Sequence, residues 1–586
     1  MIRLRPLALV AVLFVVTVEL LRASGPLLDQ VAGDIGTKAA AVLALGIFVA
    51  PGVLLVSLRR VSLPVVVVIL LVMRLLAQFI AALPITGAAA VLGMTALGLA
   101  VQRSVDPVAA TVGILAGGAV DLAVRSATFT WDFIWVGWWG LPMALLTAVA
   151  VWLALPTPAP QPEDPLRGRV WTVGVYLALW TTTLGNPAFL ASQTGYPLQA
   201  VLLAQLAALA GSAELLRRTW DHWYAGAGVL VGLALAWWGH GAVTLAGVLV
   251  TQVCATLALA RSLAARPRQR LIWAYGLFWV LPVLLYQVHY DLPLPFDNRF
   301  VLIAFAVPLC LAALGTRPHF RMPSLVNVPR LMAVALFVPL LVWITPVDAQ
   351  AVPESSGIRL MTWNIKYGRD DARGIADPQQ IADAIRASGA DVIVLQEVSR
   401  GWAIGGGVDV ASYLSHELGM AFQWGPAADG QFGNLILTNR PLADVHVGRL
   451  PYGQGPMRRS FLSARVMLTP STGIDLVTTH LTHKKENTPT RLAQIDTVLR
   501  ERPMVLAGDL NFWPSWDEPQ AFTRAGYVSV QDYTGNGPLW TSPTDRPTNR
   551  VDWIWGNDQV TFSEFAVLTN VTASDHFPLI VTVTPR

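Results

Sequence analysis

The stretch Val505-Leu506-Ala507-Gly508-Asp509-Leu510-Asn511 joins an apolar run to an acid and an amide that are two residues apart. The apolar run predicts a buried strand. On a strand, a spacing of two places Asp509 and Asn511 on the same face. A carboxylate beside a carboxamide at a strand end can hold a phosphate, a metal ion and a water molecule in a fixed relation. The same pattern is also common in a capped turn, so its meaning depends on the rest of the chain.

The region around this stretch has the pattern of a soluble α/β domain. One helix is expected to begin at Asp377-Pro378 and end at Gly389, and another to run from Thr488 to about Arg502. Eight runs predict strands, at 359–365, 391–396, 434–438, 460–468, 474–479, 504–507, 551–555 and 578–584. We therefore predict one α/β domain over residues 357–586, with helices covering its sheets.

Six polar groups of this domain lie at or near one end of a predicted strand. A carboxylate at the tip of a buried strand is costly unless it is paired or bound to a metal ion. Each group alone could be a helix cap or a hydrogen-bonded loop residue. Six of them in one domain indicate a site. They are Trp363-Asn364, Gln396-Glu397, Thr479-His480-Leu481, Gly508-Asp509-Leu510-Asn511, Asp552-Trp553-Ile554 and Ser574-Asp575-His576.

In this order the six groups resemble the motifs of the endonuclease/exonuclease/phosphatase superfamily. That family includes pancreatic-type DNases, abasic-site endonucleases, inositol-polyphosphate phosphatases and neutral sphingomyelinases. The resemblance covers residues 357–586 and implies a four-layer α/β sandwich of the DNase I type and a divalent metal ion, Mg²⁺ with Mn²⁺ as the alternative. With a multi-span region before the domain and Tyr367-Gly368 after the first motif, the chain also resembles membrane proteins that remodel GPI-anchor lipids.

The side chains suggest how a metal ion and a phosphate would be held, in agreement with the resemblance. Glu397 is the expected Mg²⁺ ligand, since this hard cation prefers one or two carboxylates together with water and phosphate oxygens. Asn364 is expected to seat the metal ion or the phosphate, and Asp575 to bind the metal ion or a water. Arg459, or its neighbour Arg458, is expected to contact the phosphate, with a surface ion pair as the alternative.

The remaining groups suggest the acid–base chemistry. Asp509 is expected to accept a proton from the attacking water, and Asn511 to hold a phosphate oxygen. His576, oriented by Asp552, is expected to bind the phosphoryl group or to act as an acid or base. His480 is expected to protonate the leaving group, a role that the resemblance supports.

The first 347 residues have a different composition and predict a polytopic membrane bundle. Hydrophobic residues make up 54% of the whole chain and charged residues only 13%, about half the share in soluble domains. Apolar segments long enough to cross a membrane recur between short loops. About thirteen spans are expected, at 6–22, 39–58, 61–83, 87–102, 107–124, 136–155, 170–190, 197–215, 223–239, 241–260, 271–289, 300–315 and 331–347. A linker at 348–356 follows.

The arginines predict the orientation of this bundle. They occupy every second loop, beginning before the first span, whereas the intervening loops carry aspartates and few cations. Positive loops face the cytoplasm, which places the N-terminus inside. An odd number of spans then places the C-terminal domain outside the cytoplasm. The loop cations are Arg3, Arg5, Arg59, Arg60, Arg103, Arg167, Arg169, Arg217, Arg218, Arg266, Arg268, Arg270, Arg317, Arg321 and Arg330.

Three functions are compatible with this organisation. The first is a membrane-anchored, metal-dependent phosphodiesterase or phosphatase that acts on a membrane lipid or lipid-linked phosphate. The second is a tethered extracellular nuclease, which normally needs a basic surface. Residues 357–586 instead carry 20 Lys and Arg against 23 Asp and Glu. The third is a transporter or lipid-binding bundle with a non-catalytic domain that recognises phosphate. It is disfavoured because every expected catalytic residue is present.

Overall fold

The structure, a computed structural model, describes residues 5–58, 61–103, 107–155, 169–216, 223–265, 269–314, 347–348, 354–535 and 539–586. The chain forms two compact units. The first contains Met1–His289, Leu294–Ile344 and Gly401–Val408. The second contains Tyr290–Pro293, Thr345–Arg400 and Asp409–Arg586. Each unit is described by itself below.

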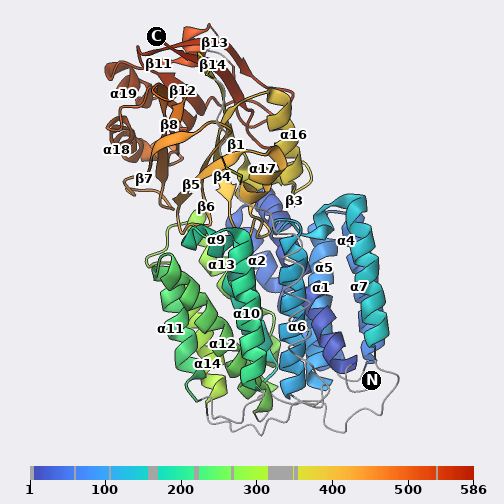
Figure 1. The fold of residues 1–586 in the computed structure, drawn as a ribbon. Coiled ribbons are helices and arrows are strands. Elements are labelled where there is room, and N and C mark those ends of the chain that lie inside the picture. Colours follow the sequence, from blue (N-terminus) through green and yellow to red (C-terminus); the bar gives the residue numbers. More distant parts are fainter. Residues whose placement is uncertain are drawn as a thin grey trace. The chain divides into compact units, whose positions relative to one another are not determined.

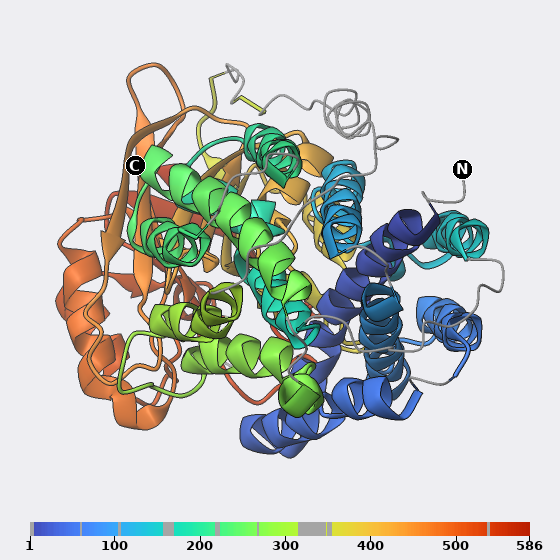
Figure 2. The ribbon, with the colours of Figure 1, turned by 90° about the horizontal axis from the view of Figure 1, so that it is seen from below.

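The first unit is helical, and its neighbouring helices α11, α12 and α14 lie side by side (Figures 1 and 2). Its α-helices are α1 (Arg5–Ile35), α2 (Thr37–Ile47), α3 (Ala50–Ser57), α4 (Leu63–Phe79), α5 (Leu83–Arg103), α6 (Pro107–Ser126), α7 (Leu141–Ala154), α8 (Trp171–Leu179), α9 (Pro187–Thr194), α10 (Leu198–Leu216), α11 (Ala225–Trp238), α12 (Ala242–Ala264), α13 (Leu277–Gln287) and α14 (Arg299–Ala313). The short turns are η2 (Phe133–Trp135), η3 (Gly137–Gly140), η4 (Trp180–Leu184), η5 (Gln269–Ala274) and η6 (Val288–Tyr290).

Several of these helices are long and apolar enough to cross a membrane. Within the described residues there are seven: Arg5–Ile35, Thr37–Ser57, Leu83–Arg103, Pro107–Ser126, Gly137–Ala154, Leu198–Leu216 and Ala242–Ala264. Four other apolar helices are shorter. The predicted number of about thirteen spans is therefore not confirmed. One reason is that the predicted span 170–190 is divided between α8, η4 and α9. Most of the predicted span 331–347 and of the linker lies outside the described residues.

Several buried charged side chains of the first unit are paired with one another. The guanidinium of Arg22 contacts Asp121 and Asp132, each at 2.7 Å, and all three side chains are buried. Arg74 contacts Glu19 at 2.8 Å. Burying a charge is costly unless it is paired and hydrogen-bonded. These ion pairs therefore explain how polar residues occur within apolar helices.

The second unit is built on two six-stranded sheets. Their orders are β13-β14-β1-β4-β6-β5 and β11-β12-β10-β9-β8-β7. The strands are β1 (Ile358–Asn364), β4 (Val392–Ser399), β5 (Ala421–Ala427), β6 (Phe432–Thr438), β7 (Leu442–Arg449), β8 (Ser460–Met467), β9 (Gly473–His480), β10 (Val505–Asp509), β11 (Val528–Ser529), β12 (Asp552–Gly556), β13 (Val560–Val567) and β14 (Leu579–Pro585). A small hairpin, β2 (Arg369–Asp370) and β3 (Ile375–Ala376), lies apart from them.

The two sheets pack face to face, and helices cover their outer faces (Figure 1). Alternate residues of the central strands fill the space between the sheets, among them Leu360, Val394, Leu476, Ala507 and Ile554. The other face of the second sheet packs against α18 (Thr488–Leu499) and α19 (Glu518–Arg524). The helices α16 (Pro378–Ser388) and α17 (Val410–Leu418) lie beside the first sheet, and α20 (Val530–Tyr533) is a single turn. This is the DNase I-like sandwich that the motifs predict.

The predicted helix boundaries follow from local capping. The Asp377 side chain accepts a hydrogen bond from the backbone N–H of Gln380 at the start of α16. Gly389 ends this helix with a φ of 65°, which glycine adopts readily. The second predicted helix begins at Thr488 as expected but ends at Leu499, three residues before the predicted end at Arg502.

Candidate active site

Four of the predicted site residues lie at the ends of central strands, on the faces that point between the two sheets. His480, Asp509 and Asp552 are register partners on the adjacent strands β9, β10 and β12. Asn364 ends β1 in the opposite sheet. Since alternate residues of a strand share a face, these four side chains continue the inner rows of Leu476, Ala507, Ile554 and Leu360. The chain therefore brings a polar cluster to one end of the sandwich.

Gly508 allows two of these strands to approach closely. A Cβ atom at this position would lie 2.0 Å from the carbonyl oxygen of Thr479 on β9. Any side chain would therefore separate β9 from β10 next to His480 and Asp509. The glycine in the opening stretch is required by this contact.

Glu397 reaches the site through an irregularity in its strand. The register of β4 against β6 shifts between Leu395 and Val398, and Glu397 has a φ of 55°. Without this bulge, strand alternation would direct only Gln396 between the sheets. Gln396 does lie there, where its amide donates to Thr478 of the other sheet at 3.1 Å. The bulge turns the next side chain, Glu397, towards the same cluster.

Asn364 links the two sheets at the site. Its side-chain amide donates to Glu397 Oε1 at 3.2 Å and to Asp509 Oδ2 at 2.9 Å. Its Oδ1 accepts the backbone N–H of Lys366 at 3.1 Å. The Asn364 side chain therefore holds the two carboxylates side by side.

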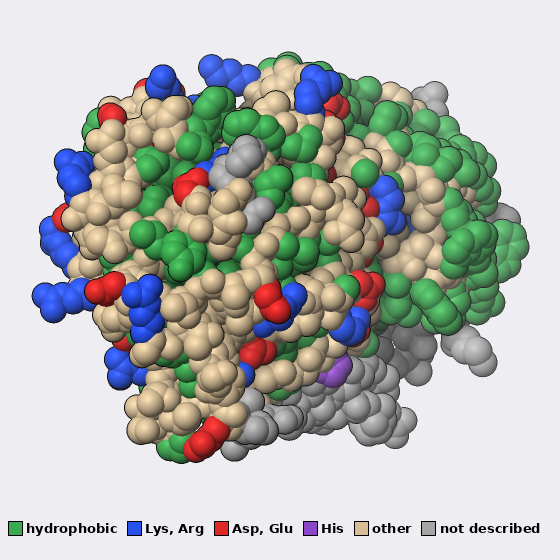
Figure 3. All heavy atoms as spheres, turned by 90° about the horizontal axis from the view of Figure 1, so that it is seen from above, with side chains coloured by type: hydrophobic (Ala, Val, Ile, Leu, Met, Phe, Trp, Pro, Cys, Tyr) green, Lys and Arg blue, Asp and Glu red, His purple; other side chains and the backbone are tan. Residues whose placement is uncertain are grey.

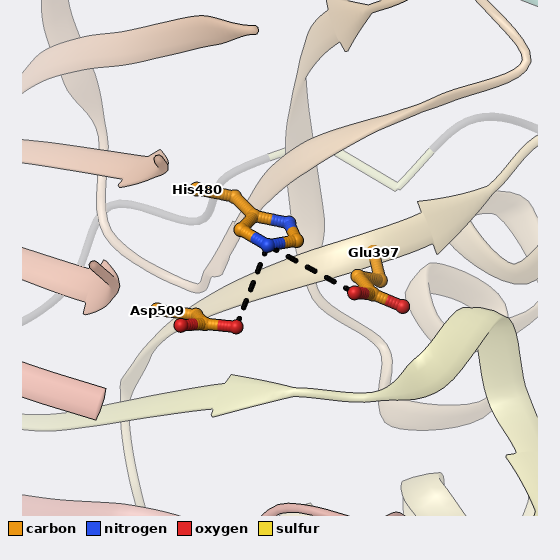
Figure 4. A group of neighbouring side chains, drawn as sticks. All are labelled: Glu397, His480 and Asp509. Atoms are coloured by element: carbon orange, nitrogen blue, oxygen red, sulfur yellow. Dashed lines mark ion pairs between the residues drawn. The ribbon is translucent and has the colours of Figure 1, made fainter. Parts of the chain in front are cut away.

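His480 lies against the same two carboxylates (Figure 4). Its Nε2 is 3.4 Å from Asp509 Oδ2 and 3.9 Å from Glu397 Oε1. Arg459 Nη1 lies 2.8 Å from His480 Nδ1. Because a guanidinium can only donate, Nδ1 accepts this hydrogen bond and the ring proton resides on Nε2. Burial, reinforced by Arg459 and His576, holds the pKa of His480 well below its ordinary value.

His576 has the opposite electrostatic environment. Its Nδ1 is 2.8 Å from Asp552 Oδ2, and its Nε2 is 4.0 Å from Asp509 Oδ2. Burial lowers the pKa of His576, but the carboxylates of Asp552, Asp509 and Asp575 together outweigh this and hold it well above its ordinary value. At neutral pH His480 is therefore neutral and His576 is an imidazolium. The backbone carbonyl of His576 accepts from Trp363 Nε1 at 2.7 Å, which fixes this segment.

Two predicted residues lie in a different arrangement from the one expected. β10 ends at Asp509, so the prediction that Asp509 and Asn511 share a strand face is wrong. Asn511 has a φ of 55°, and its side-chain amide donates to the carbonyl of Leu481 at 3.1 Å. Asp575 contacts Lys366 Nζ at 2.8 Å. The structure therefore shows Asp575 in an ion pair, and its role as a ligand of the metal ion or a water stays a prediction.

Lys366 is the site residue that the sequence interpretation missed. It also contacts Asp371 at 2.8 Å, so one ammonium joins two carboxylates beside the cluster. Burial lowers the pKa of Lys366, but Asp575 and Asp371 together raise it above its ordinary value. Its position two residues after the strand-end amide Asn364 was the available signal.

The cluster can hold a divalent cation. The polar atoms of Glu397, His480 and Asp509 lie close enough to surround one ion, and those of Asp509, Asp552 and His576 form a second such group. Because His480 Nε2 carries the ring proton and His576 is an imidazolium, the carboxylate oxygens are the ligands that these groups offer to a cation. Burial raises the pKa of Asp509 to about 7, with Asp552 and Glu397 acting in the same direction against His576. Burial, with the nearby Asp575 carboxylate, also raises the pKa of Glu397. Two carboxylates whose ionisation is opposed in this way fit a hard cation, which would offset their charge.

Addition of Mg²⁺ is therefore expected to stabilise the protein. At a concentration 100 times its Kd, the ion should raise the melting temperature of the second unit by about 5–10 °C. Differential scanning calorimetry of the full chain measures this. The shift should be lost in Glu397→Gln and retained in Glu564→Gln, the same change at an exposed residue. An equal shift in both variants would place the ion elsewhere.

Residues 361–576 match the model of the Endonuclease/Exonuclease/phosphatase family. This segment, which contains every residue of the candidate site, is a domain of that family, whose members are phosphoric ester hydrolases. In this chain it follows a region of apolar helices suited to a membrane. No curated protein matches the chain.

The solved structures that are similar to part of this chain include the following three, each from a different organism. An endonuclease/exonuclease/phosphatase from Beutenbergia cavernae is 25% identical, with 39% of this chain and 72% of that chain covered and a TM-score of 0.34. The human Nocturnin catalytic domain with bound sulfate is 20% identical, with 39% of this chain and 94% of that chain covered and a TM-score of 0.33. Truncated Caenorhabditis elegans TDP2 is 19% identical, with 39% of this chain and 98% of that chain covered and a TM-score of 0.30.

Proposed function

We propose that this protein is a membrane-anchored, Mg²⁺-dependent phosphoric ester hydrolase that acts outside the cytoplasm on a lipid-linked phosphate. The observation that carries the proposal is the cluster at the end of the two sheets. Glu397 and Asp509 lie there between the neutral His480 and the Asp552-bound His576. The family of the domain supports hydrolysis of a phosphoester.

Glu397 is the proposed main metal ligand, with Asp509 beside it. When bound, the cation, Mg²⁺ or alternatively Mn²⁺, polarises a phosphoryl oxygen and offsets the charge that develops on it. Asn364 holds the Glu397 and Asp509 carboxylates in place through the amide hydrogen bonds described above. Lys366 keeps Asp575 neutralised, so that this carboxylate does not repel the incoming phosphate.

The two histidines and Asp509 are proposed to perform the proton transfers and to bind the phosphate. Asp509 orients the attacking water and accepts its proton. His576, held as an imidazolium by Asp552, binds a phosphoryl oxygen through Nε2–H. His480 donates its Nε2–H to the leaving oxygen as a hydrogen bond. Arg459 fixes the tautomer that makes this possible, rather than contacting the phosphate itself.

Two observations favour a lipid over a nucleic acid as substrate. The catalytic domain is part of the same chain as the apolar helices described above, of which seven within the described residues are long enough to cross a membrane. The face shown in Figure 3 intersperses Lys and Arg with Asp and Glu. Residues 357–586 carry 20 Lys and Arg against 23 Asp and Glu. A polyanion that is bound through its backbone needs a basic surface. The tethered nuclease is the second candidate because its chemistry needs the same site.

A panel of substrates tests this proposal. The purified full chain in phospholipid vesicles would be given Mg²⁺ and, in turn, phospholipids, glycolipid phosphates, inositol phosphates and duplex DNA. Lipid-linked phosphates should be cleaved by the wild type and not by Glu397→Gln. Cleavage of DNA alone would favour the nuclease. Binding of phosphate esters with no turnover of any would favour the third function, a non-catalytic domain that recognises phosphate.

The proposed orientation predicts where a protease can act. With the N-terminus in the cytoplasm and the catalytic domain outside, residues 348–356 should be accessible from the exterior. A protease added to intact cells should therefore release the domain, as detected by an antibody to its C-terminus. Protection in intact cells, with cleavage only after lysis, would reverse the orientation that the arginines predict.

A further inference from the structure

A pocket in the first unit is separate from the candidate active site. It lies among α1, α2, α5, α13 and the segment Gly401–Val408, and it is open on one side. Its walls are mainly aliphatic and aromatic side chains. These include Leu28, Phe48, Leu83, Val283, Leu284 and Ile404. Helices α1 and α5 are among those long enough to cross a membrane.

The polar side chains of this wall already have partners within the protein. Arg22 makes its hydrogen bonds to Asp121 and Asp132. Ser24 donates to the carbonyl of Leu21 at 2.7 Å. Thr181 donates to the carbonyl of Leu177 and accepts from Trp279. The pocket therefore favours an occupant that requires no hydrogen bonds, namely a hydrocarbon chain.

Hydrogen bonds from other parts of the first unit fix the segment Gly401–Val408, which forms one side of the pocket. The Asn186 amide donates to the carbonyl of Gly401 at 2.6 Å. The carbonyl of Gly407 accepts from Arg125 at 2.8 Å and from Thr130 at 3.1 Å. On α1, Gly25 is in close contact with the backbone of Ile404, where a Cβ atom would lie 2.8 Å from the carbonyl oxygen. The backbone at Ile404 is therefore packed directly against α1 within the first unit.

The same segment is only a few residues away, along the chain, from a residue of the candidate active site. Ala403, which lines the pocket, follows Glu397 by six residues. Six residues of fully extended chain span at most about 20 Å. This limit is set by the length of the chain alone. The hydrocarbon chain of an ordinary lipid has a comparable length, since it spans about half of a hydrocarbon core that is about 30 Å thick.

We infer that this pocket binds one hydrocarbon chain of the lipid whose phosphate ester is hydrolysed at the Glu397–Asp509 cluster. The inference rests on the proposed function and adds a second recognition site to it. A substrate would be selected by its chain as well as by its phosphate. Soluble phosphate esters, which have no such chain, would be cleaved without use of the pocket.

Gly87 offers a direct way to fill the pocket. It lies on α5 and lines the pocket, and a Cβ atom there would have its nearest neighbour, Leu83 Cδ1, at 4.0 Å. Gly87→Leu should therefore occupy the space without disturbing the backbone. Gly211→Leu is the matched control, since Gly211 is an exposed glycine within α10 whose Cβ would meet nothing within 4 Å. Ala44→Phe, on the α2 wall, is a second filling variant.

Photo-crosslinking of the full chain in lipid nanodiscs tests the pocket. The probe is a phosphatidylinositol with a diazirine and an alkyne in one acyl chain, and labelled peptides are measured by mass spectrometry. Peptides that contain Leu28 or Ile404 should be labelled in the wild type and in Gly211→Leu. In Gly87→Leu their labelling should fall roughly tenfold or more. Labelling at the exposed residues Leu146 and Val149 of α7 should stay constant as an internal reference.

An activity measurement separates this inference from the proposed function. Gly87→Leu should raise the KM for the long-chain lipid and leave hydrolysis of bis(4-nitrophenyl) phosphate unchanged. Unchanged labelling in both Gly87→Leu and Ala44→Phe would show that the pocket does not bind the hydrocarbon chain, even if the wild type cleaves lipids. Labelling lost in both variants, with no lipid cleaved by the wild type, would retain the hydrocarbon site and overturn its assignment to a substrate.

Discussion

Replacing Asp509 by asparagine is expected to lower kcat on the cleaved phosphate ester by about 10²–10⁴-fold, the usual contribution of a general base. The side chain keeps its size, but it can no longer accept the proton of the attacking water. Asp509 is nearly fully buried and lies beside Asn364, His480 and His576. Initial rates at saturating substrate and Mg²⁺ measure the effect.

The melting temperature distinguishes this catalytic role of Asp509 from a structural one. Because burial opposes the ionisation of Asp509 in the metal-free protein, a neutral amide should leave stability in EDTA equal or higher. Asp496→Asn, at an exposed position on α18, should change neither rate nor stability. A melting temperature that falls in proportion to activity would mean that Asp509 only supports the fold.

Glu397→Gln is expected to have a comparable or larger effect, a loss of about 10³-fold or more in kcat/KM with Mg²⁺. The change removes the charge that is proposed to hold the cation, which supplies several kcal/mol of transition-state stabilisation. The loss should not be restored by excess phosphate ester. Rates measured over a range of Mg²⁺ concentrations separate a weaker affinity for the ion from a slower chemical step.

The matched comparison for Glu397 is Glu564→Gln, which makes the same change at an exposed carboxylate. This variant should keep the rate and the Mg²⁺ dependence of the wild type. If Glu397→Gln retained full activity, or if the wild type were equally active in EDTA, then Glu397 would not be the metal ligand.

The central strands of the catalytic domain could be predicted from the sequence, and its edges could not. All eight predicted strands are present, and each lies in the interior of a sheet. The longer strands that were missed, β5, β7 and β13, together with short β11, are the four edges. Interior strands are apolar on both faces and form continuous runs. Edge strands carry interruptions, such as Gly425-Pro426 in β5 and exposed polar residues in β7.

The candidate site was predictable where a residue simply ended a strand. His480, Asp509, Asp552 and Asn364 continue the inner rows of their strands. Glu397 was predicted from its chemistry, but its position depends on a bulge that strand alternation does not show. Lys366 was missed because its significance comes from Asp575, which is distant in sequence. For the first unit, hydropathy identified the apolar segments but not where their helices break.

The measurement that tests the account most directly is the release of phosphate-containing headgroup from vesicles. The full chain would be reconstituted in phospholipid vesicles with phosphatidylinositol and with duplex DNA added in the same reaction, with Mg²⁺ or with EDTA. We predict release of phosphorylated headgroup or of inorganic phosphate from lipid in Mg²⁺, none in EDTA and none with Glu397→Gln. Cleavage of DNA with no lipid phosphate released, or lipid release that persists in EDTA, would contradict the account.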